Sequence, residues 1–270
     1  MRKISGIAES RIKEIIKYTI TAIIEKKFTE SPFNHDQFCR ESPFNAALVP
    51  EEVWKSSRFE RAFVTSMGMS IYESVACILG KEIWGKAEHN YRSTGLIFRR
   101  QVDKIQEILT ELQHPKESGR SPNWVRECEE LTKCIGGDKI RVEIITDVYL
   151  EDEAHKKRAY LELKAPKPNA DQTKESKDKM LKLFCISLGS DFKTFIFYGL
   201  PYNPYIRRED YAWPHPKRYF DMINDPAIKI GKELWDIIGG EGTYENLLDI
   251  FNEVGKTTKR IIRKELLDKR

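Results

Sequence analysis

The segment Ile140–Thr173, IRVEIITDVYLEDEAHKKRAYLELKAPKPNADQT, carries the strongest indication of fold in this chain. A run rich in β-branched residues ends at Asp147, and a second run of alternating side chains begins at Arg158. The short charged turn Glu151–Lys157 separates the two runs, and this pattern is typical of a β-hairpin. The segment therefore predicts two neighbouring antiparallel strands, followed by a loop that contains two prolines.

The second predicted strand places polar and apolar side chains on opposite faces. Because side chains alternate along a strand, Tyr160, Glu162 and Lys164 share one face. Leu161 and Leu163 share the other face and anchor the strand in a core. We expect the face that carries Glu162 and Lys164 to be exposed and available for chemistry.

Acidic residues on the two predicted strands suit a divalent metal. Asp147 and Glu162 offer the hard oxygen ligands that Mg²⁺ prefers, and Mg²⁺ keeps several of its waters when it binds. Lys164 can position or deprotonate an attacking water and offset negative charge on phosphorus. The alternative is an ordinary strand with Glu and Lys on a solvated face, because short motifs also arise by chance. The hairpin and the basic loop after it favour the catalytic interpretation.

At these residues the chain resembles the PD-(D/E)xK superfamily of nucleases, and in particular the type II restriction endonucleases. Thr146-Asp147 stands where the superfamily has Pro-Asp, and Glu162-Leu163-Lys164 stands where it has (D/E)-x-K. The proline is absent here, but both acidic positions and the lysine are kept. The resemblance thus implies that Asp147 and Glu162 bind the metal and that Lys164 is catalytic.

The resemblance also implies an acidic residue on an upstream helix that faces the metal. The segment Phe63–Leu79 offers Glu73 for this position, and its alternative role is that of an exposed helical residue. The later segments ELKAPKPNADQT, YNPY and LWDIIGG resemble more narrowly the restriction enzymes that recognise short G/C-rich palindromes. The looser resemblance extends over most of the chain after Ser42.

Taken together, the resemblance implies an α/β (α+β) fold with a restriction-endonuclease-like core, in which helices flank a central mixed β-sheet. It implies a type II site-specific deoxyribonuclease that uses Mg²⁺ to cut both strands of double-stranded DNA at a short palindromic site. Two other functions remain open at this point. One is a repair or mobile-element endonuclease built on the same motif, and the other is a non-catalytic DNA-binding protein.

Composition agrees with a compact enzyme but does not by itself indicate nucleic-acid binding. Of the 270 residues, 33% are charged, yet the formal net charge is only +4, so any DNA-binding surface depends on local clustering. The N-terminal sequence lacks the apolar core of a signal peptide, and no apolar run approaches a membrane span, which predicts a cytoplasmic protein. The glycine-rich motifs of nucleotide-binding enzymes are absent, so we expect no nucleotide cofactor.

We expect an N-terminal helical region, residues 1–50, before a nuclease domain with C-terminal helices, residues 51–270. The segments Thr29–Pro50 and Lys116–Asn123 read as loops, and Thr194–Leu200 as a buried strand. Asn123 is expected to cap one helix, and Asp171 or Thr173 another. Apolar spacing and start signals predict helices over Ile7–Lys27, from Glu51 through Glu73, and over Val102–Leu112, Trp124–Cys134, Lys174–Leu188, Ala227–Gly239 and Tyr244–Leu267.

Three basic stretches are candidates for DNA contacts. The first, after the catalytic strand, comprises Lys167, Asn169, Gln172, Lys174 and Lys177. The second, within the loop Tyr202–Arg218, comprises Arg207, Arg208, Lys217 and Arg218 beside the aromatic residues Tyr205, Tyr211 and Trp213. Amide side chains and arginine forks can recognise base edges, whereas lysines contact phosphates. A capped turn and a packed surface loop are the respective alternatives. The third stretch, Lys256–Arg270, better fits a solvated helix end.

One cluster of Asp147, Glu162 and Lys164 can hydrolyse one DNA strand. Cutting two antiparallel strands at symmetric positions is simplest for two copies related by a two-fold axis. We therefore expect a homodimer. The predicted helix Ile7–Lys27 has a broad apolar surface and is a candidate for the interface, and burial within its own subunit is the alternative.

Overall fold

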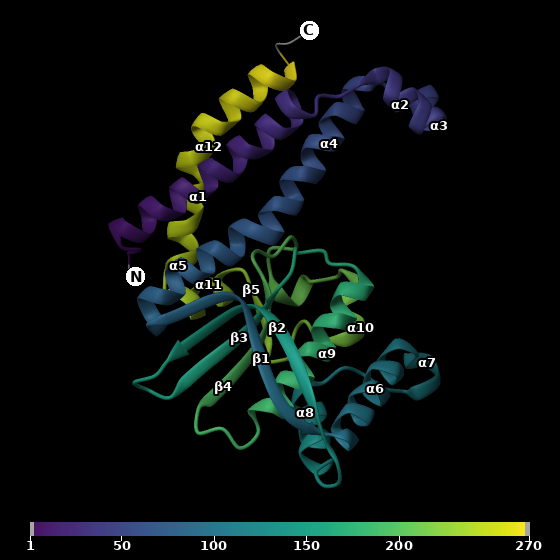
Figure 1. Cartoon of the computed structure of the whole chain (residues 1–270), viewed down its shortest axis with the longest axis vertical. Helices are drawn as coiled ribbons and strands as arrows, with labels where there is room; N and C mark the ends of the chain where they lie inside the picture. The colour runs from purple at the N-terminus through teal and green to yellow at the C-terminus, as the bar shows by residue number, and fades with distance from the viewer. Residues whose placement is uncertain (1–2, 268–270) are drawn as a thin grey trace. The chain divides into compact units, whose positions relative to one another are not determined.

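The computed structural model describes residues 3–267, which divide into two compact units (Figure 1). The first, called here the sheet unit, is Ala76–Tyr244, and the second, the helical unit, combines residues 3–75 with residues 245–267. Neither unit coincides with the ranges 1–50 and 51–270, and that predicted division stays a prediction. Within residues 3–267, every helix is too short or too polar to cross a bilayer.

The sheet unit is built on a five-stranded mixed sheet in the order β1-β2-β3-β4-β5. The strands are antiparallel from β1 to β3 and parallel from β3 to β5. Helices cover the sheet, so the predicted α/β fold with a central mixed sheet flanked by helices is confirmed. The strands are β1 (Lys86–Phe98), β2 (Lys139–Asp152), β3 (Lys157–Leu163), β4 (Lys193–Leu200) and β5 (Ile228–Ile230).

The predicted hairpin is confirmed as β2 and β3, and β4 is the predicted buried strand beside it. Strand β1 was not predicted, although it pairs with β2 along nearly its whole length. Its sequence hides it, since the fully buried residues Ala87, Ser93 and Ile97 are few and are separated by polar residues such as Glu88, Asn90 and Arg92. Period-two alternation was the available signal.

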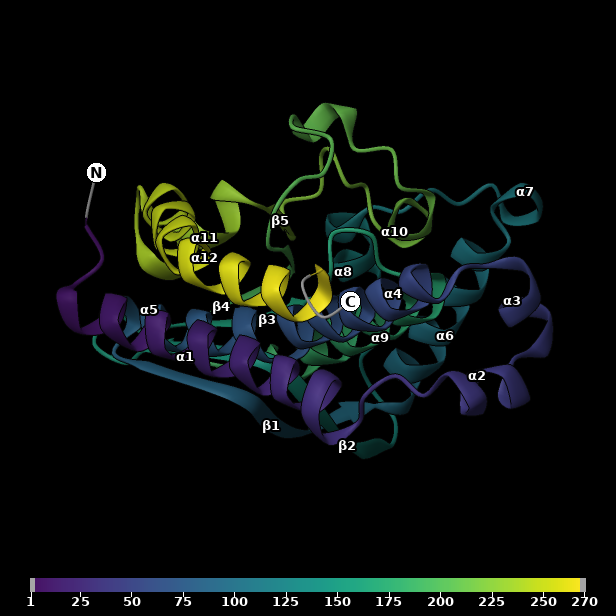
Figure 2. The ribbon, with the colours of Figure 1, turned by 90° about the horizontal axis from the view of Figure 1, so that it is seen from above.

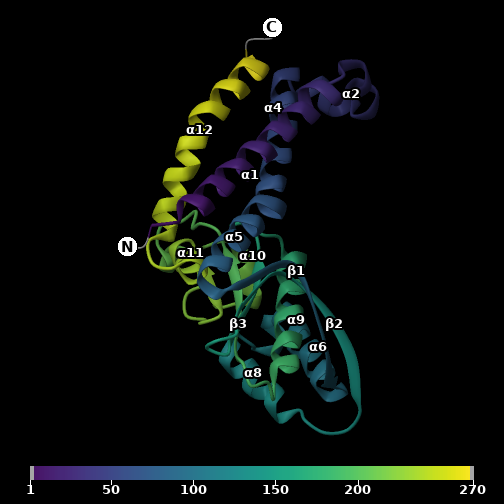
Figure 3. The same cartoon turned by 60° about the vertical axis from the view of Figure 1, so that its left-hand side comes forward.

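Helices α6 (Arg99–Gln113) and α9 (Ala170–Ser187) pack together on one face of the sheet, beside α8 (Trp124–Lys133) (Figure 3). Gly95 of β1 permits this close approach, because a Cβ there would lie 2.8 Å from the Ile186 side chain of α9. On the opposite face, α11 (Lys232–Gly239) covers β3 and β4, where a Cβ at Gly199 would clash with Leu163 and Leu234. Both faces of β3 are therefore covered.

Several predicted helix boundaries changed. Asn123 caps α8 as predicted, accepting a hydrogen bond from the backbone N–H of Arg126. The cap of α9 is Asn169 instead of Asp171 or Thr173, so the helix begins four residues earlier than predicted. The predicted helix Ala227–Gly239 begins only at α11, because its first residues form β5. The predicted loop Lys116–Asn123 overlaps the short helix α7 (Pro115–Ser118).

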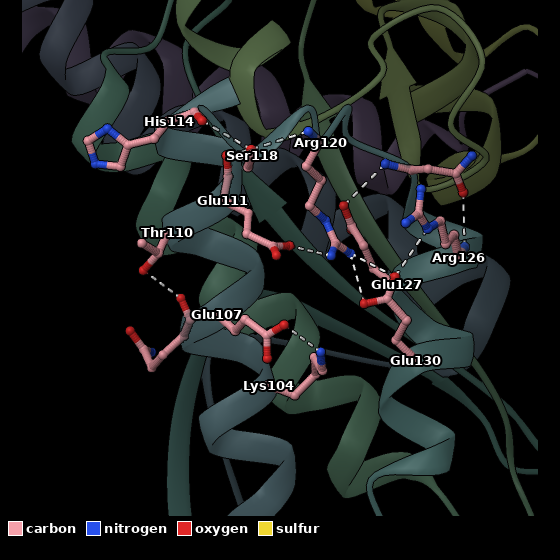
Figure 4. Close-up of polar contacts among 12 residues, drawn as sticks. Lys104, Glu107, Thr110, Glu111, His114, Ser118, Arg120, Arg126, Glu127 and Glu130 are labelled. Carbon is pink, nitrogen blue, oxygen red and sulfur yellow. Dashed lines mark hydrogen bonds and ion pairs between the residues drawn. The ribbon is translucent and has the colours of Figure 1, made fainter. Parts of the chain in front are cut away.

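A polar cluster fastens α6, α7 and α8 to one another (Figure 4). The Arg120 guanidinium, 7% exposed, donates to Glu111 of α6 at 2.7 Å and to both carboxylate oxygens of Glu130 of α8 at 3.0 and 3.1 Å. Arg126, which is exposed, forms a second ion pair with Glu130. Because one buried cation meets two carboxylates from different helices, this cluster has a structural role.

The helical unit contains α1 (Gly6–Glu25), α4 (Glu51–Ser66) and α12 (Thr243–Leu267), which confirm the helices predicted there (Figure 2). An ion pair between Lys13 and Glu253 joins α1 to α12. The predicted loop Thr29–Pro50 contains two short helices instead, α2 (His35–Glu41) and α3 (Pro43–Leu48), because Asn34 caps the first and Pro43 starts the second.

Gly68 marks a change of helical geometry within this unit. It lies in the π-helical turn η2 (Met67–Ile71), which joins α4 to α5 (Tyr72–Trp84). A second π turn, η1 (Lys26–Glu30), follows α1 directly. Such turns insert one extra residue into a helix and shift the faces of the residues that follow.

Candidate active site

The candidate site lies where β2 and β3 separate. Their regular pairing ends with Val148 opposite Leu161. Beyond this pair, the backbone N–H of Leu163 in β3 donates to a side chain of β2. Asp147 Oδ2 accepts this N–H at 2.8 Å. The carboxylate thus takes the place of a backbone acceptor for this N–H at the end of the pairing between the two strands.

The structure brings together the three side chains predicted from the hairpin. Lys164 Nζ lies 2.8 Å from Asp147 Oδ2 and 3.3 Å from Glu162 Oε2. Lys179 of α9, which the sequence did not indicate, places its Nζ 3.8 Å from the same oxygen of Glu162. The site therefore consists of two carboxylates and two ammonium groups, drawn from β2, β3, the residue after β3 and the covering helix.

Glu162 is far more buried than predicted. Its side chain is 1% exposed, whereas those of Asp147 and Lys164 are each 18% exposed. The expectation that Glu162 lies on an exposed face was wrong, because α9 covers that face of the sheet. Among residues 3–267, no hydrogen-bond donor reaches Glu162 Oε1. A buried carboxylate oxygen without a donor is costly, and such a group usually has a function.

Burial and the nearby charge of Asp147 raise the pKa of Glu162 from 4.5 to about 7, against the opposing effect of Lys164 and Lys179. Burial alone would lower the pKa of Lys164, but the two adjacent carboxylates outweigh it and raise this pKa. Lys164 is therefore protonated at neutral pH in this arrangement. Within the cluster, ionisation is least favourable for the Glu162 carboxyl group, and an added cation would favour its ionised form.

The donor set fits a divalent cation that keeps some of its waters. Asp147 and Glu162 supply carboxylate oxygens from adjacent strands, and Glu162 Oε1 has a free coordination position. Among the described residues, neither this site nor any other holds a group of three or more His, Cys, Asp or Glu side chains that could enclose a metal ion. A two-carboxylate site is the arrangement expected for Mg²⁺, which is not usually enclosed by protein ligands alone.

Glu73, the third acidic residue predicted for the site, lies in the first turn of α5, in the helical unit. Its predicted role stays a prediction.

The loop after Lys164 is fastened to the loop between β4 and β5. Tyr211 Oη donates to the Pro166 carbonyl and Trp213 Nε1 to the Pro168 carbonyl, both at 2.8 Å. Lys167 Nζ lies over the rings of Tyr205 and Trp213, at 5.7 and 5.6 Å from their centroids. The first and second predicted DNA-contacting stretches are therefore physically connected, a link that no sequence pattern revealed.

The two candidate arginines of this loop differ. Arg207 is exposed and forms a two-point ion pair with Asp210 of the adjacent short helix η3 (Arg208–Asp210). Arg208 instead uses all three of its guanidinium nitrogens within the chain, donating to the Met222 and Asp225 carbonyls and to Glu233. These contacts favour a structural role for Arg208. Arg207 has the exposure that base recognition requires.

The remaining candidates lie on α9 and on α10 (Pro214–Tyr219), which pack together. Lys217 and Arg218 are exposed on α10. Asn169 and Gln172 form the capping box of α9, so both amides have local partners, and Lys174 donates to Gln113.

Lys177 was wrongly predicted as a DNA contact. Its side chain is wholly buried and pairs with Glu127.

Comparison with known proteins identifies the family of this chain. A family described as "Type II restriction endonuclease, HinfI" matches residues 8–255. The type II restriction enzyme HgiCII of Herpetosiphon aurantiacus is 28% identical over 243 residues, covering 83% of this chain and 81% of HgiCII. HgiEI of the same organism is 28% identical over 227 residues, with the same coverage.

A further relative comes from another organism. The type II restriction enzyme MjaII of Methanocaldococcus jannaschii is 30% identical over 215 residues, which cover 74% of this chain and 55% of MjaII. No solved structure matches the chain significantly. The chain belongs to the HinfI family of type II restriction endonucleases, and its activity is that of a site-specific deoxyribonuclease.

Proposed function

We propose that this nuclease cuts both strands of DNA at a short, G/C-rich palindromic site, through a PD-(D/E)xK-type cluster of Asp147, Glu162 and Lys164 that uses Mg²⁺. The observation that carries the proposal is the convergence of the Asp147 and Glu162 carboxylates on Lys164 Nζ, with the other oxygen of Glu162, Oε1, buried and without a donor among the described residues. Enzymes of this class generally use a divalent metal. A cytoplasmic location follows from this role, since the DNA that such an enzyme cuts is found there.

Asp147 and Glu162 would hold the metal ion. When bound, it would lower the pKa of a coordinated water and polarise the scissile phosphate. The fit rests on the chemistry of this donor set and on the raised pKa of Glu162, because a divalent charge would remove the cost of ionising that carboxylate. Asp147 also accepts the Leu163 N–H and so links β2 to β3, which gives it a structural role as well as the proposed ligand role.

Lys164 would act mainly as a cation. Its raised pKa keeps the proton on Nζ, so the side chain donates hydrogen bonds to a phosphate oxygen and offsets charge as the phosphorus becomes pentacovalent. This favours charge stabilisation and positioning of water over general-base catalysis by the lysine. Lys179, drawn to Glu162 from α9, would support the same carboxylate and keep it from taking up a proton. The products would carry 5′-phosphate and 3′-hydroxyl ends.

The DNA would lie across the connected loops beside this cluster. We propose that Arg207 exchanges its pairing with Asp210 for a guanine edge, since an arginine fork matches guanine O6 and N7. Phosphate contacts would come from Lys167 and Lys174, with Lys217 and Arg218 on the adjacent helix. Asn169 and Gln172 would contribute through the exposed start of α9.

We further propose that the active form is a homodimer, because each chain carries one such cluster and a palindrome presents two equivalent strands. Light scattering with and without a cognate duplex measures this directly. A particle that stays monomeric in both conditions, yet cuts both strands in one binding event, contradicts the dimer.

The decisive experiment is digestion of a DNA of known sequence, with the fragment ends determined. We expect discrete bands with Mg²⁺, none with excess chelator, and specific binding without efficient cleavage with Ca²⁺. Glu162→Ala should lower turnover by roughly 10³-fold or more. Lys157→Ala, an exposed lysine at the start of the same strand, is the matched control and should cut normally.

The outcomes separate the alternatives. A smear of fragments would point to a repair or mobile-element endonuclease, and binding without any cleavage would point to a non-catalytic protein. Discrete cleavage that survives in Glu162→Ala would remove the proposed mechanism.

A further inference from the structure

The helical unit contains a groove of about 450 Å³ that the catalytic chemistry does not use. Its walls come from the end of α1, from the π turn η1 and from one face of α4. All of its lining residues belong to the helical unit, so its geometry is independent of the sheet unit.

The α4 wall is a continuous helical stripe. Its lining residues recur every three or four positions from Trp54 to Ser66, which places them in line along one face. With a rise of 1.5 Å per residue, this stripe extends for about 18 Å along the helix. An elongated wall of this length suits a linear ligand better than a single small ion.

The groove is strongly cationic. Lys26 and Lys27 line it from η1, and Arg58 and Arg61 line it from α4. Among residues 3–267, no acidic side chain lines the groove. Lys55 on the same helix shows the usual arrangement, since it pairs with Glu51 one turn earlier. The charged side chains that line the groove are therefore all positive.

The cations of the groove are also largely unengaged. Arg58 makes one long hydrogen bond, 3.4 Å, to the Ser31 carbonyl. Within the described part of the chain, Lys26, Lys27 and Arg61 form no side-chain ion pair or hydrogen bond, and Lys26 and Arg61 are exposed. Exposed cations with no partner can bind a mobile anion without first breaking an internal contact.

Neutral donors complete the lining. Ser57, Thr65 and Ser66 contribute hydroxyl groups on the same stripe, and Trp54 provides an aromatic wall at its N-terminal end. Cations and hydroxyl donors are the contacts that proteins make with the phosphates of the DNA backbone, where they bind without regard to sequence.

We propose that this groove binds backbone phosphates of duplex DNA outside the recognition site, so that the enzyme holds flanking DNA sequence-independently. The proposal rests on the proposed function in taking DNA as the ligand. The length of the stripe favours several successive phosphates over one free phosphate ion, and the absence of acidic lining in the described residues favours a polyanion.

The test uses the full-length protein and a labelled duplex of random sequence, titrated in chelator at several KCl concentrations. We expect Lys27→Gln and Arg61→Gln each to reduce the slope of log Kd against log salt by about 0.9, the value for one phosphate contact. The double variant should lose about twice that and bind roughly tenfold more weakly at moderate salt. Arg11→Gln, an exposed arginine on α1 outside the groove, is the control and should match the wild type.

Hydroxyl-radical footprinting on a long duplex with the cleavage site identifies the ligand. We expect the double variant to lose protection of flanking phosphates and to keep protection of the site itself. If the folded double variant keeps the wild-type salt slope and footprint, the groove does not bind DNA and the proposal is wrong. A variant that loses binding of inorganic phosphate or polyglutamate but keeps the wild-type DNA slope would also contradict the proposal.

Failure of the proposed function gives a different result. If the wild type does not cleave with Mg²⁺ but the groove variants still change the salt slope, the proposed catalytic mechanism is wrong and the proposed DNA binding by the groove is supported. If the wild type cleaves and Lys164→Ala abolishes cleavage while the groove variants bind like the wild type, the groove fails and the mechanism stands.

Discussion

Helix α9 carries two lysines, Lys177 and Lys179, that meet carboxylates in contrasting surroundings. Lys177 and Glu127 form an ion pair that is almost completely buried, with the ammonium 4.5 Å from the centre of the Phe220 ring. Lys179 meets Glu162 at 3.8 Å in a partly open cluster. Being two residues apart on a helix, the lysines face different sides, and each serves a different carboxylate.

The two sites differ in how completely charge is matched. Lys177 and Glu127 match one charge with one, and Glu127 also accepts the backbone N–H of Asn123 at 3.1 Å, although burial raises the pKa of Glu127. At the candidate active site two carboxylates, Asp147 and Glu162, lie together and repel each other, which adds to the effect of burial on the pKa of Glu162. A matched pair maintains the fold, whereas an incompletely matched pair leaves a position for a ligand.

The largest expected effect tests the matched site. Lys177→Met leaves Glu127 buried without its cation and should lower the free energy of unfolding by about 3 to 5 kcal/mol. Urea denaturation measures this. Lys182→Met, which breaks a surface pair with Asp178 on the same helix, is the control and should cost about 0 to 1 kcal/mol.

A second variant shows whether the cost comes from the unpaired charge. Replacing both partners, Lys177→Met with Glu127→Leu, should recover most of the lost stability, because no buried charge remains. If Lys177→Met costs no more than Lys182→Met, the buried pair does not stabilise the fold as described.

A smaller effect of opposite sign tests the unmatched site. In chelator, Glu162→Gln should raise the free energy of unfolding at pH 8 by about 1 to 3 kcal/mol. With Mg²⁺ present, the same variant should no longer cleave DNA. Glu162 has a pKa of about 7 when folded and about 4.5 when unfolded, so the folded state binds the proton more tightly. Ionisation of Glu162 therefore does not lower the stability of the folded state below about pH 4.5, and it lowers that stability by the full amount above about pH 7.

Urea titrations from pH 5 to 8 measure this difference between wild type and variant. The gain in stability from Glu162→Gln should grow as the pH rises through this range. A variant less stable than the wild type at pH 8 would mean that the lysines match Glu162 fully and that the two sites do not differ in this respect.

The smallest effect concerns the link between the two loops. Tyr211→Phe removes the hydrogen bond to the Pro166 carbonyl, two residues after Lys164, and should cost about 1 kcal/mol of stability. Because this contact positions the segment that follows Lys164, cleavage at the cognate site should slow a few-fold, with little change in DNA affinity. Stopped-flow cleavage and binding titrations separate these quantities.

Tyr202→Phe, an exposed tyrosine at the start of the same loop, is the control and should leave both quantities unchanged. Equal losses in the two variants would show that the loop as a whole, and not this hydrogen bond, supports the site.

Much of the candidate site was predictable because it depends on local order. Alternation along β3 put Glu162 and Lys164 on one side, and the short turn Glu151–Lys157 placed Asp147 on the neighbouring strand. The cap of α8 by Asn123 was equally local. Such features follow from side-chain direction and turn chemistry within a single hairpin or helix start, so the sequence alone specifies them.

The features that were missed depend on distant segments. Strand β1 has few apolar residues, and it became evident only through its pairing with β2. Lys177 and Lys179 look alike in sequence, and the packing of α8 against α9 decides which one is buried. Arg208 resembled Arg207 until the carbonyls of Met222 and Asp225 came within its reach.

The sequence by itself determined the hairpin, its acidic pair and the adjacent lysine, because strand geometry fixes which neighbouring side chains share a face. Only the tertiary structure decided that Glu162 is buried, that Lys179 joins it and that Lys177 is withdrawn from solvent. The physical reason is that burial and charge pairing are set by the helix packed over the sheet. That helix reaches the site from residues beyond the catalytic motif, through a crossover between parallel strands.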